Sequence, residues 1–139
     1  MTDLTRQGLE LFAELMGPEA AEALRAGMEE TGFGAPIAKL AADFAFGSVW
    51  ARDGLERKQR SLVVIGILIA QRQSQELKNH IRIGLTNGFT AREIQEATIQ
   101  AIPYVGFPAV ASAISAIVEV LRERGLDDGA MTAEDRGLL

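Results

Sequence analysis

Hydrophobic residues recur along the chain with the spacing of helices rather than strands. Leu4, Leu11 and Leu15 lie near helical spacing in a first segment that stops at Gly17–Pro18. No run of alternating polar and apolar residues bounded by turn residues predicts a sheet. The pattern predicts an all-α chain with helices over residues 3–16, 18–30, 36–51, 53–73, 74–87, 90–102 and 109–124.

Capping signals support several of these boundaries. The D-x-x-E stretch at 53–56 and the T-x-x-E stretch at 90–93 have the spacing of capping boxes. Ser74 is the expected N-cap of the fifth helix, and Gly88 suits the left-handed position that follows a helix end. Pro103, with the Gly-Phe-Pro stretch after it, is expected to break the sixth helix. The short loops favour antiparallel neighbouring helices.

The longest apolar run, LVVIGILIA at 62–70, is apolar nearly all round. We therefore expect it inside the bundle or in a subunit interface. It has about half the length that a membrane span needs, and the first residues lack the basic and apolar regions of a signal peptide. These features predict a cytoplasmic protein that makes no membrane contact.

The chain has 139 residues, which favours a single domain over 1–139. The polar tail, 126–139, is predicted to be mobile, or to act as an arm that touches a neighbouring subunit.

Composition narrows the function classes. The net charge of −5 argues against nucleic acid as a partner, but local arginines can still bind a small anionic substrate. The absence of cysteine excludes disulfides, thiol catalysis and thiolate metal sites. A single histidine argues against a metal site within one subunit.

Three separated segments resemble the carboxymuconolactone decarboxylase family in order and spacing. They are FAFGSVWARDGLERKQRSL (44–62), ELKNHIRIGLTNGFTAREI (76–94) and YVGFPA (104–109). The resemblance covers residues 5–122 and is closest to the γ-carboxymuconolactone decarboxylase branch, from which the stretch QRQSQE, 71–76, departs.

A thiol peroxidase branch of the same superfamily, the alkylhydroperoxidase D-like (AhpD-like) proteins, carries the motif C-x-x-C-x-x-x-H. When that motif is aligned on His80, its two cysteines fall on Gln73 and Glu76. Neither residue can form a thiolate or a disulfide, so thiol peroxidase activity is excluded.

The resemblance implies an AhpD-like orthogonal bundle of six to seven helices that assembles into a homo-oligomer, a trimer or a hexamer. It implies decarboxylation of 4-carboxymuconolactone, or a closely related lactone acid, in the β-ketoadipate pathway of aromatic-compound catabolism. No cofactor is expected, because the conjugated lactone accepts the electrons that departing CO₂ leaves behind. The protein must orient the acid, stabilise charge on the lactone oxygen and protonate carbon.

His80 is the candidate proton donor, because histidine titrates near neutral pH. Glu76 is four residues earlier on the same predicted helix, where its carboxylate would favour the imidazolium and orient it. The alternative is a packed histidine beside an ordinary first-turn acid.

Arg60 is the first candidate for binding the substrate carboxylate, because its planar guanidinium suits a two-point contact. It could instead pair with Glu56, four residues earlier. Glu56 is a possible second acid or base, with capping as its alternative role. Arg52 and Arg82 are weaker candidates, and Arg82 points away from His80 around the helix.

Aromatic residues complete the candidate site. Tyr104, placed in an apolar loop, could donate its hydroxyl to the lactone oxygen, or could simply be packed. Trp50, with Phe44 and Phe46, is expected to form core or pocket wall.

Two other functions stay open at this level. One is a different proton-transfer enzyme on the same fold, such as an isomerase or a lactone-processing enzyme. The other is a non-catalytic oligomeric protein that binds a small acid, because one fold hosts many functions.

Overall fold

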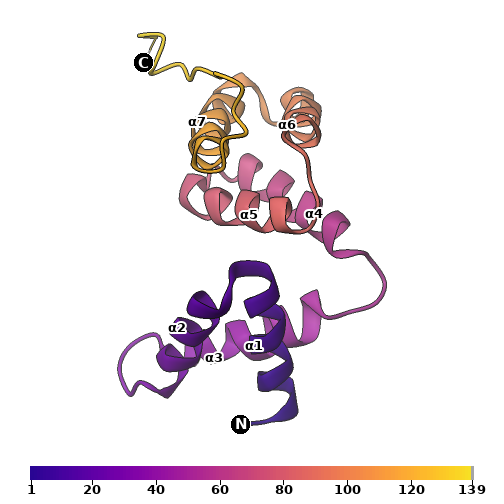
Figure 1. Ribbon diagram of the computed structural model, residues 1–139, viewed down its shortest axis with the longest axis vertical. Helices are drawn as coiled ribbons and strands as arrows, with labels where there is room; N and C mark the ends of the chain where they lie inside the picture. The colour runs from indigo at the N-terminus through magenta and orange to yellow at the C-terminus, as the bar shows by residue number, and fades with distance from the viewer. Residues whose placement is uncertain (139) are drawn as a thin grey trace. The chain divides into compact units, whose positions relative to one another are not determined.

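The computed structural model describes residues 1–138 as helices joined by short turns, with no strand in that range (Figure 1). The all-α prediction is therefore confirmed. In the described residues the elements are seven α-helices and a π-helix, η1: α1 (Asp3–Met16), α2 (Pro18–Glu29), α3 (Ala35–Leu40), η1 (Ala41–Trp50), α4 (Arg57–Ala70), α5 (Ser74–Thr86), α6 (Ala91–Val105) and α7 (Phe107–Glu123).

The chain forms two compact units, Met1–Arg57 and Lys58–Leu139, of which Leu139 lies outside the described residues. Each unit is described by itself below. The single domain over 1–139 stays a prediction.

Two glycines in the first unit let the α1 backbone approach the η1 backbone closely. A Cβ atom on Gly8 would lie 1.8 Å from the carbonyl oxygen of Ala42, and one on Gly47 would lie 2.7 Å from that of Leu4. Real Cβ atoms do not approach carbonyl oxygens this closely, so this crossing requires glycine at both positions.

The segment predicted as one α-helix, 36–51, is divided into α3 and the π-helix η1. The Ser48 hydroxyl donates to the carbonyl oxygen of Asp43, five residues earlier, at 2.9 Å. The Asp43 carboxylate in turn accepts from Thr5 Oγ1 at 2.6 Å and Lys39 Nζ at 2.5 Å. Lys39, and then Thr5, lower the pKa of Asp43, so this carboxylate stays ionised and ties α1 to η1.

The aromatic residues of η1 divide between core and surface. Trp50 is buried, and the Phe46 ring lies 4.7 Å from that of Phe12 between ring centroids. Phe44 is 62% exposed, so a place in the core is wrong for this residue, and a place in a pocket wall stays a prediction.

Some predicted helix boundaries near caps and prolines are wrong. Residues 51–56 form turns, and α4 begins only at Arg57, because Gly54 disfavours helix by about 1 kcal/mol at the expected start. Ser74 is the first residue of α5 rather than its N-cap, which is Gln73. Pro103 lies inside α6, two residues before the helix ends at Val105, so it does not break the helix where the sequence predicts.

The other capping signals are confirmed. The Thr90 hydroxyl accepts from Glu93 N at 3.0 Å, and the Glu93 carboxylate accepts from Thr90 N at 3.1 Å, which closes the predicted capping box. Gly88 has a φ of +102°, as expected for the residue that follows the end of α5.

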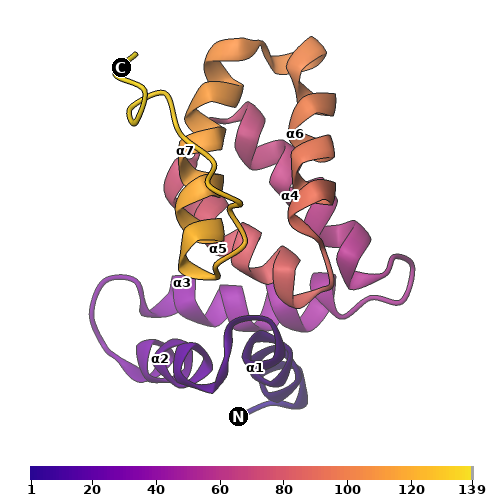
Figure 2. The ribbon, with the colours of Figure 1, turned by 45° about the horizontal axis from the view of Figure 1, so that its top comes forward.

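Aliphatic side chains from all four helices of the second unit form its core. Figures 1 and 2 show α6 and α7 side by side, joined by the short turn at Gly106. The core residues are Ile65 and Ile69 of α4, Leu77 and Ile81 of α5, Ile94 of α6, and Val110, Ala113, Ala116, Ile117, Val120 and Leu121 of α7.

Helix α4 buries one side only. Its buried residues are Ser61, Ile65 and Ile69, whereas Leu62 and Ile67 are exposed. The expectation that residues 62–70 lie inside the bundle is therefore wrong, because the run is long enough to cover a core with one stripe and leave the other outward. A subunit interface there stays a prediction.

The tail packs on its own helix, α7, instead of being mobile, and its predicted contact with a neighbouring subunit stays a prediction. The Ser115 hydroxyl donates to Glu134 at 2.9 Å, and Arg122 donates to Asp135 at 2.5 Å and to the Ala130 carbonyl at 2.7 Å. These contacts from α7 fix the tail, which polarity alone could not predict.

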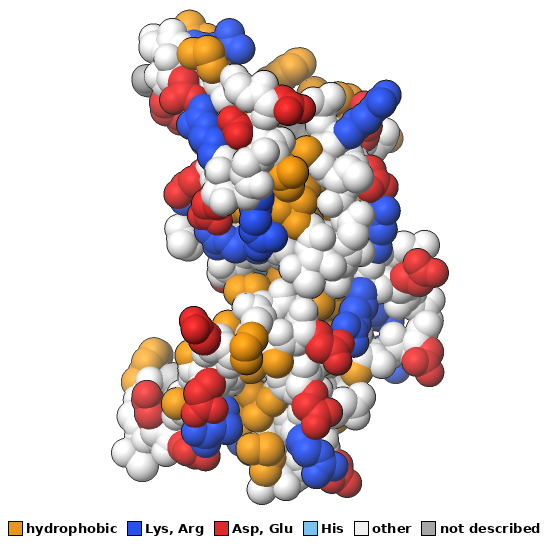
Figure 3. All heavy atoms as spheres, viewed as in Figure 1, with side chains coloured by type: hydrophobic (Ala, Val, Ile, Leu, Met, Phe, Trp, Pro, Cys, Tyr) orange, Lys and Arg blue, Asp and Glu red, His pale blue; other side chains and the backbone are white. Residues whose placement is uncertain are grey.

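Charged side chains of both signs are interspersed with apolar ones on the visible surface of each unit (Figure 3). None of the described helices is both long and apolar enough to cross a membrane. The cytoplasmic location stays a prediction.

Candidate functional site

Helix α5 carries the candidate proton donor and presents different sides to its neighbours. Leu77 and Ile81 are fully buried in the core of the second unit. Gly84 faces α4, since a Cβ there would lie 3.4 Å from Ile65 Cδ1. Packing against the core therefore fixes the backbone of α5, and with it the positions from which its polar side chains extend.

Glu76 and His80 come together as the sequence predicts. Their four-residue spacing places them on one side of α5, with Glu76 Oε2 at 3.7 Å from His80 Nε2. This is within ion-pair range but longer than a hydrogen bond. The His80 side chain is 14% exposed and its Nδ1 atom is buried, whereas the Glu76 side chain is 60% exposed.

The electrostatic balance at His80 differs from the expected one. Burial lowers the pKa of His80 below its usual value, and the Glu76 carboxylate raises it by less. Glu76 thus acts in the expected direction, but burial has the larger effect. Burial therefore favours the neutral form of the imidazole.

Helix α4 contacts the C-terminal end of α5 on the side that carries His80. Asn87, which caps α5 seven residues after His80, donates from its side-chain amide to Ser61 Oγ of α4 at 2.8 Å. Arg60 is the residue before Ser61, is half-buried, and has a buried Nε atom. The candidate carboxylate-binding residue thus belongs to the helix that packs beside the histidine helix.

Another side of α5 makes ion pairs with α7. Arg82 donates to the Glu123 carboxylate through Nη2 at 2.8 Å and Nε at 3.1 Å. Lys78 Nζ lies 2.5 Å from Glu119 Oε2. The prediction that Arg82 points away from His80 is confirmed, and its guanidinium joins two helices.

Asn79 makes two polar contacts on α5 that the sequence did not lead us to predict. Its Nδ2 donates to Glu76 Oε1 at 3.1 Å, and its Oδ1 accepts from Arg82 Nη1 at 3.0 Å. The three-residue spacing on either side of Asn79 was the available signal, since such residues are neighbours on a helix.

The other predicted site residues come from other elements. Trp50, Arg52 and Glu56 belong to the first unit, where Trp50 ends η1 and the other two are exposed in the following turns. Tyr104 lies in α6 and is 82% exposed, so its placement in a loop is wrong, as is the alternative that it is packed.

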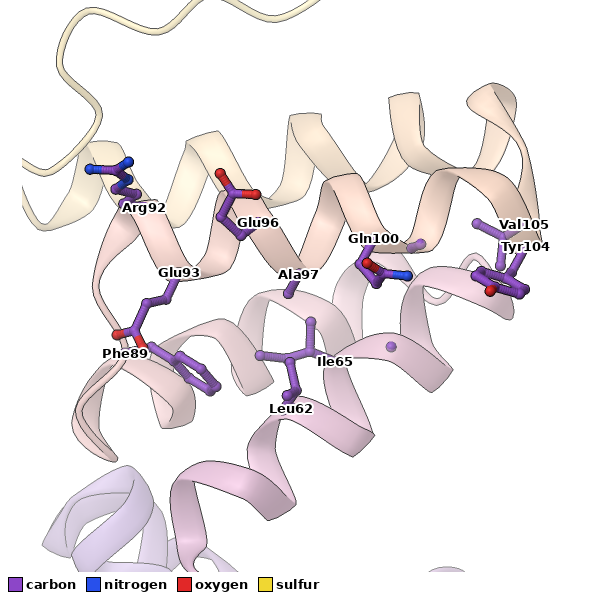
Figure 4. Close-up of a pocket in the computed structure, with 12 residues that line it drawn as sticks. Leu62, Ile65, Phe89, Arg92, Glu93, Glu96, Ala97, Gln100, Tyr104 and Val105 are labelled. Atoms are coloured by element: carbon purple, nitrogen blue, oxygen red, sulfur yellow. The ribbon is translucent and has the colours of Figure 1, made fainter.

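A mainly apolar hollow of about 680 Å³ lies between α4 and α6 (Figure 4). Phe89 stands at one end and Tyr104 at the other, with Leu62, Ile65 and Ala97 between them. His80 does not line this hollow. Within residues 1–138, no three His, Asp or Glu side chains are grouped as a metal would need.

Comparison with known proteins places this histidine helix in a family. The profile of the Carboxymuconolactone decarboxylase family matches residues 35–119, which contain Arg60, Glu76 and His80. The chain belongs to the carboxymuconolactone decarboxylase family. The predicted resemblance is therefore confirmed.

Two relatives in this family are named as decarboxylases. The nitrosuccinic acid decarboxylase of Metarhizium robertsii is 39% identical over 109 residues, 78% of this chain and 74% of the relative. The 4-carboxymuconolactone decarboxylase of Acinetobacter baylyi is 33% identical over 121 residues, 87% of this chain and 89% of the relative. An uncharacterized 15.0 kDa protein of Paracoccus denitrificans is 35% identical over 80 residues, 56% of this chain and 60% of the relative.

Membership in the carboxymuconolactone decarboxylase family and these names support a carboxy-lyase in general.

Proposed function

We propose that this protein decarboxylates a small anionic acid without a cofactor, and that 4-carboxymuconolactone is the first candidate substrate. The observation that carries the proposal is His80, largely buried beside Glu76 on α5 within the segment that the family profile matches. A largely buried histidine next to a carboxylate is a recognised arrangement for proton transfer.

The substrate itself provides the electron sink in this proposal. When CO₂ departs, the electron pair of the broken C–C bond passes into the conjugated lactone carbonyl. His80 then transfers a proton to carbon, and water or a buffer acid restores the proton on the imidazole. Arg60 binds the carboxylate, and Arg52, Tyr104, Trp50 and Glu56 stay proposed contributors to binding or proton transfer.

The lowered pKa of His80 fits this cycle. Burial favours the neutral imidazole. A bound polycarboxylate adds negative charge beside the ring and raises its pKa, so a proton is taken up as the substrate arrives. The negative charge that develops during CO₂ loss acts in the same direction.

Nitrosuccinate is the second candidate substrate, because the Metarhizium relative is named for it. Its nitro group can accept the electron pair left by CO₂, as the lactone carbonyl does. Both candidates are small acids with an electron sink next to the departing carboxylate, so one histidine and one carboxylate-binding arginine serve either.

The test is CO₂ release from each acid by the purified protein. Turnover of 4-carboxymuconolactone with little turnover of nitrosuccinate supports the first candidate, and the reverse supports the second. Binding of both acids without CO₂ release would favour a small-acid-binding protein. Proton exchange or isomerisation of the lactone without CO₂ release would favour another proton-transfer enzyme.

We also propose that the protein is a homo-oligomer, a trimer or a hexamer. Exposed apolar side chains on α4, among them Leu62, Val63 and Ile67, support this, because a small protein seldom leaves such a stripe in water. Light scattering at micromolar concentration tests it, and a monomer there would contradict it.

A further inference from the structure

A continuous series of polar contacts runs from α7 along α5 to the candidate proton donor. Glu123 on α7 accepts two hydrogen bonds from Arg82, at 2.8 and 3.1 Å. Arg82 donates to the Asn79 amide at 3.0 Å, and Asn79 donates to Glu76 at 3.1 Å. The other oxygen of Glu76 lies 3.7 Å from His80 Nε2.

The chemistry of these groups fixes which way the Asn79 amide points. A guanidinium can only donate hydrogen bonds, and an ionised carboxylate can only accept them. Between Arg82 and Glu76, the Asn79 amide must therefore turn its oxygen to the arginine and its nitrogen to the carboxylate. The reverse orientation would lose both hydrogen bonds.

We propose that Asn79 is a positioning residue, which holds the Glu76 carboxylate against His80 through an amide that Arg82 orients. The catalytic consequence rests on the proposed function, in which His80 supplies the proton. The positioning itself depends only on the contacts described above.

Glu76 needs such a support because its contact with His80 is weak by itself. Its side chain is 60% exposed, and 3.7 Å is too long for a hydrogen bond. An exposed glutamate otherwise samples several side-chain conformations, and only some of them face the histidine. The hydrogen bond from Asn79 selects a conformation in which one carboxylate oxygen faces the imidazole.

The charged side chains on the helices beside α5 are the same in the wild type and in every variant that tests this inference. The charged side chains of the helices packed against α5 are Arg57, Lys58 and Arg60 on α4 and Glu119, Arg122 and Glu123 on α7. None of them is altered in the variants below, so a difference between variants reports on Glu76 and Asn79.

His80 is the only histidine in the chain, so NMR titration reads its pKa without ambiguity. We would titrate the wild type, Asn79→Ala, Glu76→Gln and the double variant. Alanine is favourable in helices, so Asn79→Ala should fold. We expect Asn79→Ala to shift the His80 midpoint downward, by less than Glu76→Gln does, because the raising effect of Glu76 weakens when its carboxylate turns to water.

The double variant separates positioning from a general structural effect. We expect Asn79→Ala to cause no further shift in the Glu76→Gln background, because the charge that it positions is absent. Equal shifts in both backgrounds, or an unchanged or raised midpoint from Asn79→Ala alone, would overturn the proposal. Gln75→Ala, an exposed substitution one residue before Glu76, is the matched control and should leave the midpoint unchanged.

The activity readout tests the link to function separately. The pH dependence of kcat for CO₂ release should shift in Asn79→Ala in the same direction as the His80 midpoint, with KM unchanged. A protein without decarboxylase activity would overturn the proposed function, and the NMR comparison would still decide the positioning of Glu76.

Discussion

Two sides of α5 both carry ionisable side chains, and they differ in what those side chains do. On the side that faces α7, Lys78 and Arg82 make ion pairs with Glu119 and Glu123 at 2.5 and 2.8 Å. On the other side, Glu76 lies 3.7 Å from His80, the imidazole is largely buried, and its pKa is lowered.

The contrast shows how burial distinguishes a structural charge from a candidate for chemistry. Short pairs of permanently charged groups satisfy one another and join helices, but they neither gain nor lose a proton near neutral pH. A buried histidine with a more distant carboxylate is the group that can change its charge. We therefore propose that the side of α5 with Glu76 and His80 serves activity and that the pairs with α7 serve stability.

The largest effect that this contrast predicts is on turnover. His80→Gln keeps a polar side chain of similar size but removes the titrating group, so we expect kcat for CO₂ release to fall by about 10²–10⁴. Its urea midpoint should stay close to that of the wild type. Undiminished CO₂ release by this variant would remove His80 from the mechanism.

A moderate effect on stability is expected from the opposite side. Lys78→Met keeps the apolar part of the side chain but removes its pair with Glu119, so the free energy of unfolding should fall by about 0.2–1 kcal/mol. Urea unfolding measures this, and the kcat for CO₂ release should be unchanged. A large loss of kcat with unaltered stability would instead place the α7 side in the substrate site.

The smallest effect is a dependence of stability on pH. The pKa of His80 in the folded protein lies below its ordinary value of 6.5, so the unfolded chain takes up a proton at a higher pH than the folded chain does. The free energy of unfolding should therefore fall as the pH is lowered from 6.5 toward the folded pKa. Urea unfolding across that window measures it, and His80→Gln should lack this component. A free energy of unfolding that rises as the pH is lowered through that window would mean that Glu76, rather than burial, has the larger effect on the His80 pKa.

Much of this helix could be predicted from the sequence. Helical spacing and the pair Asn87–Gly88 located α5, and the four-residue interval joined Glu76 to His80. Local sequence rules suffice for such features, because they depend on neighbours within one turn.

Other features depend on contacts between distant residues. The close crossing at Gly8 and Gly47 involves α1 and η1, and neither segment alone indicates it. The dominant effect on the His80 pKa is burial, which only the packed helices determine. The polarity of the tail predicted that it would be mobile. Ser115 and Arg122 on α7 provide hydrogen-bond partners for the tail that polarity does not reveal.

The most direct test of the central claim is the NMR titration of His80 with and without succinate, a dicarboxylate that has neither a lactone nor a nitro group. We predict that succinate raises the His80 pKa in a saturable way, because its carboxylate would bind beside the imidazole. Amide signals that saturate with succinate while the His80 pKa is unchanged would contradict it, since the acid would then bind away from His80.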